Sequence, residues 1–184
     1  GRRVVVSLHE LARIAVVAAA LGVLARVMVR VTVGVEAHTH EFIATGHEDQ
    51  KFGFSLAGGQ AFEAASRILA RPDVFELLGL HSHIGTFILD VRAYAQQARI
   101  MAEFMEAAER ETGCRIEYLD IGGGFASRNS LQGLYLPPDQ TVPSFEQYAE
   151  AIVTALTEAT RGRAALGKPV PALVLETGRA LVDD

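Results

Sequence analysis

The chain has 184 residues, of which 49% are hydrophobic and 21% are charged, and its formal net charge is −5 at pH 7. This composition is typical of a folded globular domain and excludes a disordered tail. The acidic balance argues against nucleic acid and anionic membranes as main partners. A single cysteine, Cys114, excludes an internal disulfide and a cysteine-built zinc site, and it fits a reducing compartment. We therefore expect a cytoplasmic protein.

Strands and helices are expected to alternate along the chain. Short β-branched runs predict strands, and longer stretches between capping residues and glycines predict helices. In chain order, we expect a strand at 4–6, a helix between 7 and 22, a strand at 27–33, a helix at 60–70, a strand at 77–83, a helix at 90–112, and then a strand at 116–121, a helix at 144–161 and a strand at 171–176.

Serines and glycines mark several of these helix ends. Two pairs have the spacing of a capping box, in which the serine caps the helix and the third residue after it reaches back. The pairs are Ser7 with Glu10 and Ser144 with Gln147. Gly22 and Gly113 stand where a left-handed glycine commonly ends a helix.

This alternation predicts an α/β fold with a parallel sheet that is buried on both faces. About five strand–helix units are expected, and both an open doubly wound sheet and a partial (β/α)8 TIM barrel fit them. A complete barrel takes about 250 residues, so a barrel here would lack its first strands. No linker or repeat interrupts residues 1–184, which we expect to form a single domain. The two long loops, 36–59 and 125–143, are expected to be functional.

Unusual residues follow three of the predicted strands at their carboxyl ends. They are the run His81-Ser82-His83-Ile84-Gly85-Thr86, the glycines Gly122, Gly123 and Gly124, and the run Glu176-Thr177-Gly178-Arg179. This edge of a parallel sheet carries the functional site in barrels and open sheets alike. Glycines let backbone N–H groups approach an anion, although a flexible turn is the alternative. A buried carboxylate at Glu176 is expected to need a partner.

Two further patterns leave alternatives open. His81 and His83 share a face of their strand and suggest a metal, as does the second pair His38 and His40. No histidine follows His83, so we expect no metal and keep a metal-dependent barrel hydrolase as the outsider. Alternation in the strand at 27–33 places its valines toward the helices and Arg30 toward the site, with a structural ion pair as the alternative for Arg30.

Taken together, five segments resemble the fold-type III pyridoxal-phosphate-dependent decarboxylases, and most closely the diaminopimelate decarboxylases among them. The segments are Val29-Arg30-Val31, Lys51-Phe52-Gly53, His81-Ser82-His83-Ile84-Gly85, Asp120-Ile121-Gly122-Gly123-Gly124 and Glu176-Thr177-Gly178-Arg179. The resemblance implies a barrel of the alanine racemase and ornithine decarboxylase type that binds pyridoxal 5′-phosphate, followed by a C-terminal β-domain, in a homodimer. The chain would then be the later part of that barrel, without its first strands and without the β-domain.

The resemblance also implies roles for individual residues. His83 would stack on the pyridine ring, Glu176 would pair with the ring nitrogen, and Arg179 would also contact substrate. The other implied cofactor-binding residues, most of them around the phosphate, are Arg30, Thr86, Gly122, Gly123, Gly124, Thr177, Gly178 and Arg179. A carboxylate keeps the ring nitrogen protonated and the ring electron-accepting, which favours a decarboxylase over the related alanine racemases.

The implied reaction is decarboxylation of meso-diaminopimelate to L-lysine, in lysine biosynthesis. Thr86-Phe87 and Thr177 depart from the usual family residues, so ornithine, arginine and carboxynorspermidine remain alternative substrates. The only lysines, Lys51 and Lys168, do not match the Schiff-base position. We therefore expect that lysine upstream of Gly1 and expect the chain alone to be inactive. A truncated, non-catalytic remnant is the remaining alternative.

Overall fold

The computed structural model describes residues 1–35, 52–126, 142–178 and 181. In these residues, no helix is both long enough and apolar enough to span a membrane. The elements follow in the order β1 (Arg3–Val5), α1 (Leu8–Leu21), β2 (Ala25–Thr32), β3 (Phe54–Ser55), α3 (Gln60–Leu69), β4 (Phe75–His81), α4 (Val91–Thr112), β5 (Tyr118–Asp120), α5 (Phe145–Ala159), a 3₁₀ turn (Ala164–Leu166) and β6 (Ala172–Val174).

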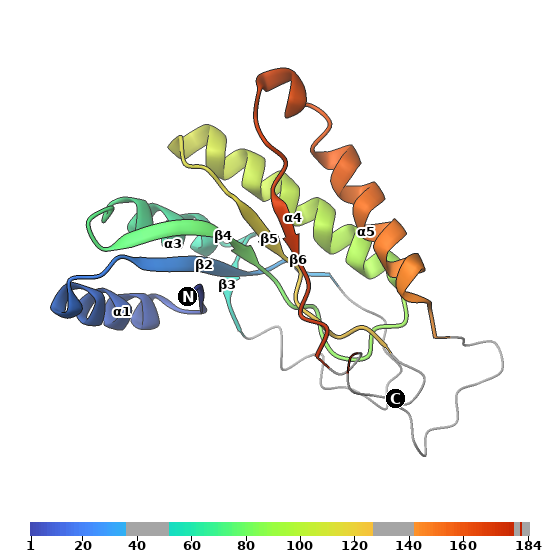
Figure 1. Cartoon of the computed structure of the whole chain (residues 1–184), viewed down its shortest axis with the longest axis horizontal. Helices are drawn as coiled ribbons and strands as arrows, with labels where there is room; N and C mark the ends of the chain where they lie inside the picture. The colour runs from blue at the N-terminus through green and yellow to red at the C-terminus, as the bar shows by residue number, and fades with distance from the viewer. Residues whose placement is uncertain (36–51, 127–141, 179–180, 182–184) are drawn as a thin grey trace, which may run out of the picture.

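The strands form one parallel sheet in the order β1-β2-β4-β5-β6, and β3 pairs with the carboxyl end of β2. Their carboxyl ends all point to the same side of the molecule (Figure 1). The described strands follow one another without the reversal of order that defines a doubly wound sheet. The partial TIM barrel is therefore confirmed, and the doubly wound sheet is wrong.

Helices cover one face of this sheet. A single hydrophobic core joins α1, α3, α4 and α5 to the sheet side chains of that face, among them Val27, Val29, Val31, Leu80 and Leu119. Helices α4 and α5 lie side by side over the half of the sheet that the later strands form (Figure 1). The predicted valine face of β2 is thus confirmed, because three of its valines are fully buried against helices.

The opposite face of the sheet carries polar side chains. Strand pairing places Arg30 beside His81, and His81 beside Asp120. Paired residues of parallel strands point to the same side, so these three form a row across the sheet. The inward direction predicted for Arg30 is confirmed. The prediction that every strand is buried on both faces is wrong for β6, an edge strand whose residues are exposed or half-buried.

The helix ends agree with the sequence signals in all but one detail. Ser144 and Gln147 form both hydrogen bonds of the predicted capping box. Gly22 and Gly113 end α1 and α4 in the left-handed conformation, with φ of 62° and 69°. Ser7 accepts from the Glu10 N–H as predicted, but the Glu10 carboxylate accepts from the N–H of Val6 rather than that of Ser7.

Strand β3 is missing from the sequence-based expectations, which assign its residues to a loop. Two residues are too few to show a period, and their pairing with Val31 and Thr32 is a tertiary contact. Cys114 lies half-buried against the core.

Candidate functional site

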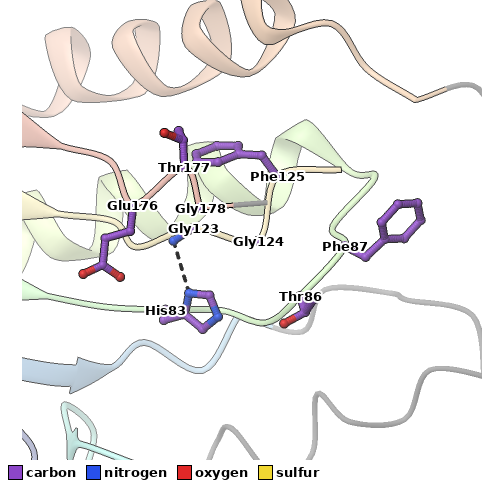
Figure 2. Close-up of a pocket in the computed structure, with 9 residues that line it drawn as sticks. All are labelled: His83, Thr86, Phe87, Gly123, Gly124, Phe125, Glu176, Thr177 and Gly178. Atoms are coloured by element: carbon purple, nitrogen blue, oxygen red, sulfur yellow. Dashed lines mark hydrogen bonds between the residues drawn. The ribbon is translucent and has the colours of Figure 1, made fainter. Parts of the chain in front are cut away.

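Three loops meet where β4, β5 and β6 end. Backbone hydrogen bonds tie them together, from the Ser82 N–H to the Asp120 carbonyl (2.8 Å) and from the Glu176 N–H to the Gly122 carbonyl (2.8 Å). The loops line a cavity of about 200 Å³ that is open to solvent on one side. Figure 2 shows the residues that line it: His83, Thr86, Phe87, Gly123, Gly124, Phe125, Glu176, Thr177 and Gly178.

The glycines after β5 are required by close packing. A Cβ atom on Gly123 would overlap the carbonyl oxygen of Glu176, and one on Gly124 would overlap the carbonyl oxygen of Gly85. Gly122 and Gly124 also have positive φ angles, of 72° and 87°, which disfavour other residues. The structure therefore favours a tightly packed backbone at this position over a flexible turn.

Two of the three glycine N–H groups are engaged inside the protein. The Gly122 N–H donates to Asp120 Oδ1 (2.9 Å), and the Gly123 N–H donates to His83 Nδ1 (3.2 Å). Within the described residues, the Gly124 N–H has no such acceptor, and Gly124 lines the cavity. Of the three predicted anion-binding amides, that of Gly124 is the one that no acceptor in the described part of the chain occupies, so it is the one that a ligand can use.

The imidazole of His83 has a defined orientation at the cavity wall. Its Nδ1 accepts the Gly123 hydrogen bond, drawn as a dashed line in Figure 2, so the proton of the neutral ring lies on Nε2. A hydrogen bond through one ring nitrogen fixes the plane of the ring. A histidine fixed in this way can present its flat face to a planar ligand.

A second group of titratable residues lies beside the cavity, on the inner face of the sheet. Nε2 of His81 is 3.5 Å from Oε2 of Glu176, and ligand atoms of His81, Asp120 and Glu176 all lie within 4.8 Å of one another. The sequence predicts a buried carboxylate at Glu176, but the structure shows its side chain 51% exposed. The reason is that β6 is an edge strand in this chain.

Burial shapes the protonation of this group. Loss of solvent raises the pKa of Asp120 to about 6, and the charge of Glu176 adds to the rise while the Gly122 N–H opposes it. Burial also lowers the pKa of His81, and the attraction of Glu176 only partly offsets this effect. At neutral pH, the imidazole of His81 is therefore neutral beside two carboxylates.

Two side chains of helix α4 form hydrogen bonds with the backbone of these loops. The buried Gln97 amide donates from Nε2 to the carbonyls of both Ser82 and Ile121, at 3.0 Å each. The Tyr94 hydroxyl donates to the Gly123 carbonyl (2.9 Å), and its ring stacks on Phe125. These contacts fix the histidine loop and the glycine loop relative to each other.

The structure brings most of the predicted site residues together. His83, Thr86, Gly123, Gly124, Glu176, Thr177 and Gly178 line the cavity. Gly122 packs against His83, and Arg30 lies on β2 next to His81. Arg179, His38, His40, His47 and Lys51 lie outside the described residues. Lys168 pairs with Glu109 (3.1 Å), away from the cavity, as expected for a lysine that does not serve the site.

Sequence reasoning did not identify several residues of this site. Tyr94 and Gln97 support it, and Phe125 lines it. Phe87, noted in the sequence only as a departure from the family, also lines it and has a positive φ of 58°, which is unusual for a residue other than glycine. A glutamine on the buried, alanine-rich face of the predicted helix at 90–112 is the signal that indicates a polar partner for Gln97. Nothing in the sequence shows the contact between His81 and Glu176.

These residues fit a pyridoxal phosphate group. The cavity combines an oriented imidazole at His83, a carboxylate at Glu176 and the Gly124 N–H, which has no acceptor among the described residues. Such a set suits a flat, charged heterocycle with an anionic arm. The imidazole of His81 and the carboxylates of Asp120 and Glu176, beside the cavity, are also suitable in type for a divalent cation.

Comparison with known proteins agrees with pyridoxal phosphate as the group that this cavity suits. Residues 2–183 match the family described as pyridoxal-dependent decarboxylase, pyridoxal binding domain. The diaminopimelate decarboxylase of Mycobacterium leprae is 41% identical over 185 residues, and that of Mycobacterium bovis is 42% identical over 185 residues. Each alignment covers 98% of this chain, but only 37% and 39% of the respective relative.

A solved structure shares the architecture as well. The diaminopimelate decarboxylase of M. jannaschii in complex with L-lysine superposes with a TM-score of 0.78 at 28% identity. The match covers 98% of this chain and 38% of that chain. Both the sequence and the fold place the cavity within a known cofactor-binding unit. The chain therefore belongs to the pyridoxal-dependent decarboxylase family, through its pyridoxal-binding domain.

Proposed function

We propose that this chain is the cofactor-binding part of a decarboxylase that converts meso-diaminopimelate to L-lysine. The single observation that carries the proposal is the convergence of His83, the glycine loop and Glu176 on one cavity at the carboxyl ends of β4, β5 and β6. Diaminopimelate decarboxylases at 41% and 42% identity support the substrate. Ornithine, arginine and carboxynorspermidine remain the competing substrates.

Several residues of the cavity have a proposed role. His83 packs its imidazole against the pyridine ring, and Gly124 binds the phosphate through its backbone N–H. The N–H of Gly178 already donates to the Glu176 carbonyl (2.9 Å), so Gly178 would act by allowing the backbone to approach the phosphate closely. Glu176 holds a proton on the ring nitrogen. When bound, pyridoxal phosphate supplies an electron sink for the pair left as carbon dioxide departs. The positive charge that Glu176 maintains on the ring makes this sink stronger.

Further roles are proposed for residues at the edge of the site. Thr86 and Thr177 would add polar contacts to the phosphate, while Arg30 and Arg179 would contribute positive charge, with Arg179 also binding the substrate. Gly122 and Gly123 would act by allowing close approach of the backbone, since their N–H groups are already engaged. The Schiff-base lysine is proposed to lie outside this chain.

We also propose the setting in which the site works. The resemblance to fold-type III decarboxylases supports an intact protein that is a cytoplasmic homodimer with a C-terminal β-domain. In that protein, residues 1–184 would form part of a single barrel domain. Alone, the chain is expected to bind the cofactor without turnover.

The test is carbon dioxide release by the protein encoded by the whole reading frame that contains this segment. Meso-diaminopimelate, L-ornithine and L-arginine are supplied separately, and the amine product is identified. We expect carbon dioxide and L-lysine from meso-diaminopimelate, and strongly reduced turnover in Glu176→Gln. Release only from ornithine or arginine would replace the proposed substrate. No release from any amino acid by a protein that carries the cofactor would contradict the decarboxylase itself.

A further inference from the structure

The contact between His81 and Glu176 joins a buried side chain to an exposed one. His81 has an exposed fraction of 4% and belongs to β4, whereas Glu176 follows the edge strand β6 and has a side chain that is 51% exposed. Only Glu176 of the two lines the cavity. An exposed glutamate has three side-chain torsions to restrict, so the carboxylate needs a fixed neighbour to hold one direction.

The surroundings of His81 determine where its proton lies. Nε2 faces a carboxylate oxygen of Glu176 at 3.5 Å, and a lone pair on that nitrogen would be repelled. Nδ1 is buried and has no hydrogen-bond partner among the described residues. A buried N–H without an acceptor is costly. The favoured form is therefore the neutral imidazole with its proton on Nε2.

The charged groups around His81 agree with the neutral form. Arg30 lies beside it on β2, Asp120 beside it on β5, and His83 and Glu176 complete the group. Burial, Arg30 and His83 lower the pKa of His81, and Glu176 raises it, with a net lowering. A neutral donor leaves the negative charge of Glu176 available to a ligand.

We propose that His81 is a positioning residue, which donates its Nε2–H to one carboxylate oxygen of Glu176 and so directs the other oxygen to the cavity. The inference deepens the proposed function, since the ligand to which Glu176 is directed is the pyridine nitrogen of the cofactor. His81 touches neither the cavity nor the reacting atoms. Its effect is on the geometry of Glu176.

The first experiment uses the full chain without cofactor, so it does not depend on the proposed function. Histidine labelled with ¹⁵N is incorporated, excess chelator removes metals, and the His81 nitrogens are assigned by their loss in His81→Gln. We expect Nε2 to be protonated and Nδ1 unprotonated at pH 7.5, with a change in the Nε2 signal in Glu176→Ala. A proton on Nδ1, or on both nitrogens, would overturn the proposal, as would a stoichiometric metal that resists chelation.

The second experiment measures affinity for pyridoxine 5′-phosphate, which has the ring and phosphate of the cofactor but no aldehyde to react with lysines. His81→Leu is expected to weaken binding by about tenfold, as for loss of one hydrogen bond to a charged group. His81→Gln keeps an N–H donor near the position of Nε2 and is expected to restore most of the affinity. Circular dichroism spectra that match the unsubstituted chain show that both variants are folded.

The outcomes separate the two claims. If the unsubstituted chain fails to bind pyridoxine 5′-phosphate, the proposed function fails, while the nitrogen assignment still decides the role of His81. If the chain binds and folded His81→Leu binds equally well, the positioning role is wrong. Equal losses in His81→Leu and folded His81→Gln would also overturn it, because a donor at that position would then have no effect.

Discussion

At the scale of single residues, Gly123 shows why the glycine loop tolerates no side chain. Its Cβ position is taken by the carbonyl oxygen of Glu176, so Gly123→Ala must push the loops after β5 and β6 apart. We expect a loss of about 1–3 kcal/mol in the free energy of unfolding, typical of overpacking. Urea denaturation checks this value. Gly162→Ala is the matched control, because nothing lies within 4 Å of its Cβ position; equal losses in both variants would contradict the packing argument.

Asp120 gives the site a pH dependence. Its pKa is about 6 in the folded chain against 3.8 for the ordinary side chain, a difference worth about 3 kcal/mol. Because the folded state favours the protonated form, this contribution is complete below pH 4 and is lost as the pH rises through 6. Asp120→Asn removes the titration and can still accept the Gly122 N–H.

The measurement is the free energy of unfolding of both proteins from pH 4 to pH 7. We expect the stability of the unsubstituted chain to fall relative to that of Asp120→Asn as the pH rises across this range. A difference that stays constant with pH would show that burial does not perturb Asp120.

At the scale of elements, a buried ion cluster joins α4 to the segment that follows α5. Arg163 pairs with Glu106 (2.6 Å) and with Glu109 (3.0 Å), and the side chains of Arg163 and Glu109 are 2% and 4% exposed. Glu109 also accepts from the N–H of Ile116, just before β5. The cluster therefore fixes the entry into β5 and the approach to β6.

Arg163→Met is expected to cost about 3–5 kcal/mol, because it leaves the Glu109 carboxylate buried without its main partner. Arg99→Ala breaks the exposed pair between Arg99 and Glu158, which also joins α4 to α5 (3.4 Å), and is expected to cost less than about 1 kcal/mol. Urea denaturation of the two variants gives the comparison. Similar costs would mean that burial does not decide the strength of these pairs.

The helices and strands also show which parts of the fold can be predicted from local sequence patterns. Helices α1, α4 and α5 are predicted within a few residues because each combines apolar periodicity with a capping residue or a terminal glycine, and α3 is predicted although it has no side-chain cap. The strand predicted at 77–83 lies two residues further along than β4, because the following histidine loop continues the same extended pattern. The short β3 and the exposure of β6 depend on neighbours in space and are invisible to a local pattern.

At the scale of the whole molecule, the chain separates its core from its site. One face of the sheet and the helices form the apolar core, and the other face presents Arg30, His81 and Asp120 in a row. Period-two alternation in β2 predicts this division. The motifs at the strand ends predict which residues approach the cavity, because parallel strands bring their carboxyl ends to one edge. The partner of Glu176 and the engagement of the Gly122 and Gly123 amides follow from the paths of the loops, which spacing does not determine.

The central claim is that the loops after β4, β5 and β6 form one binding site for a pyridoxal phosphate group. The most direct measurement is a calorimetric titration of the 184-residue chain with pyridoxine 5′-phosphate. The account predicts one site per chain, weakened in Glu176→Gln and in Gly123→Ala and unchanged in Gly162→Ala. Absence of binding, or binding that neither Glu176→Gln nor Gly123→Ala affects, would contradict it.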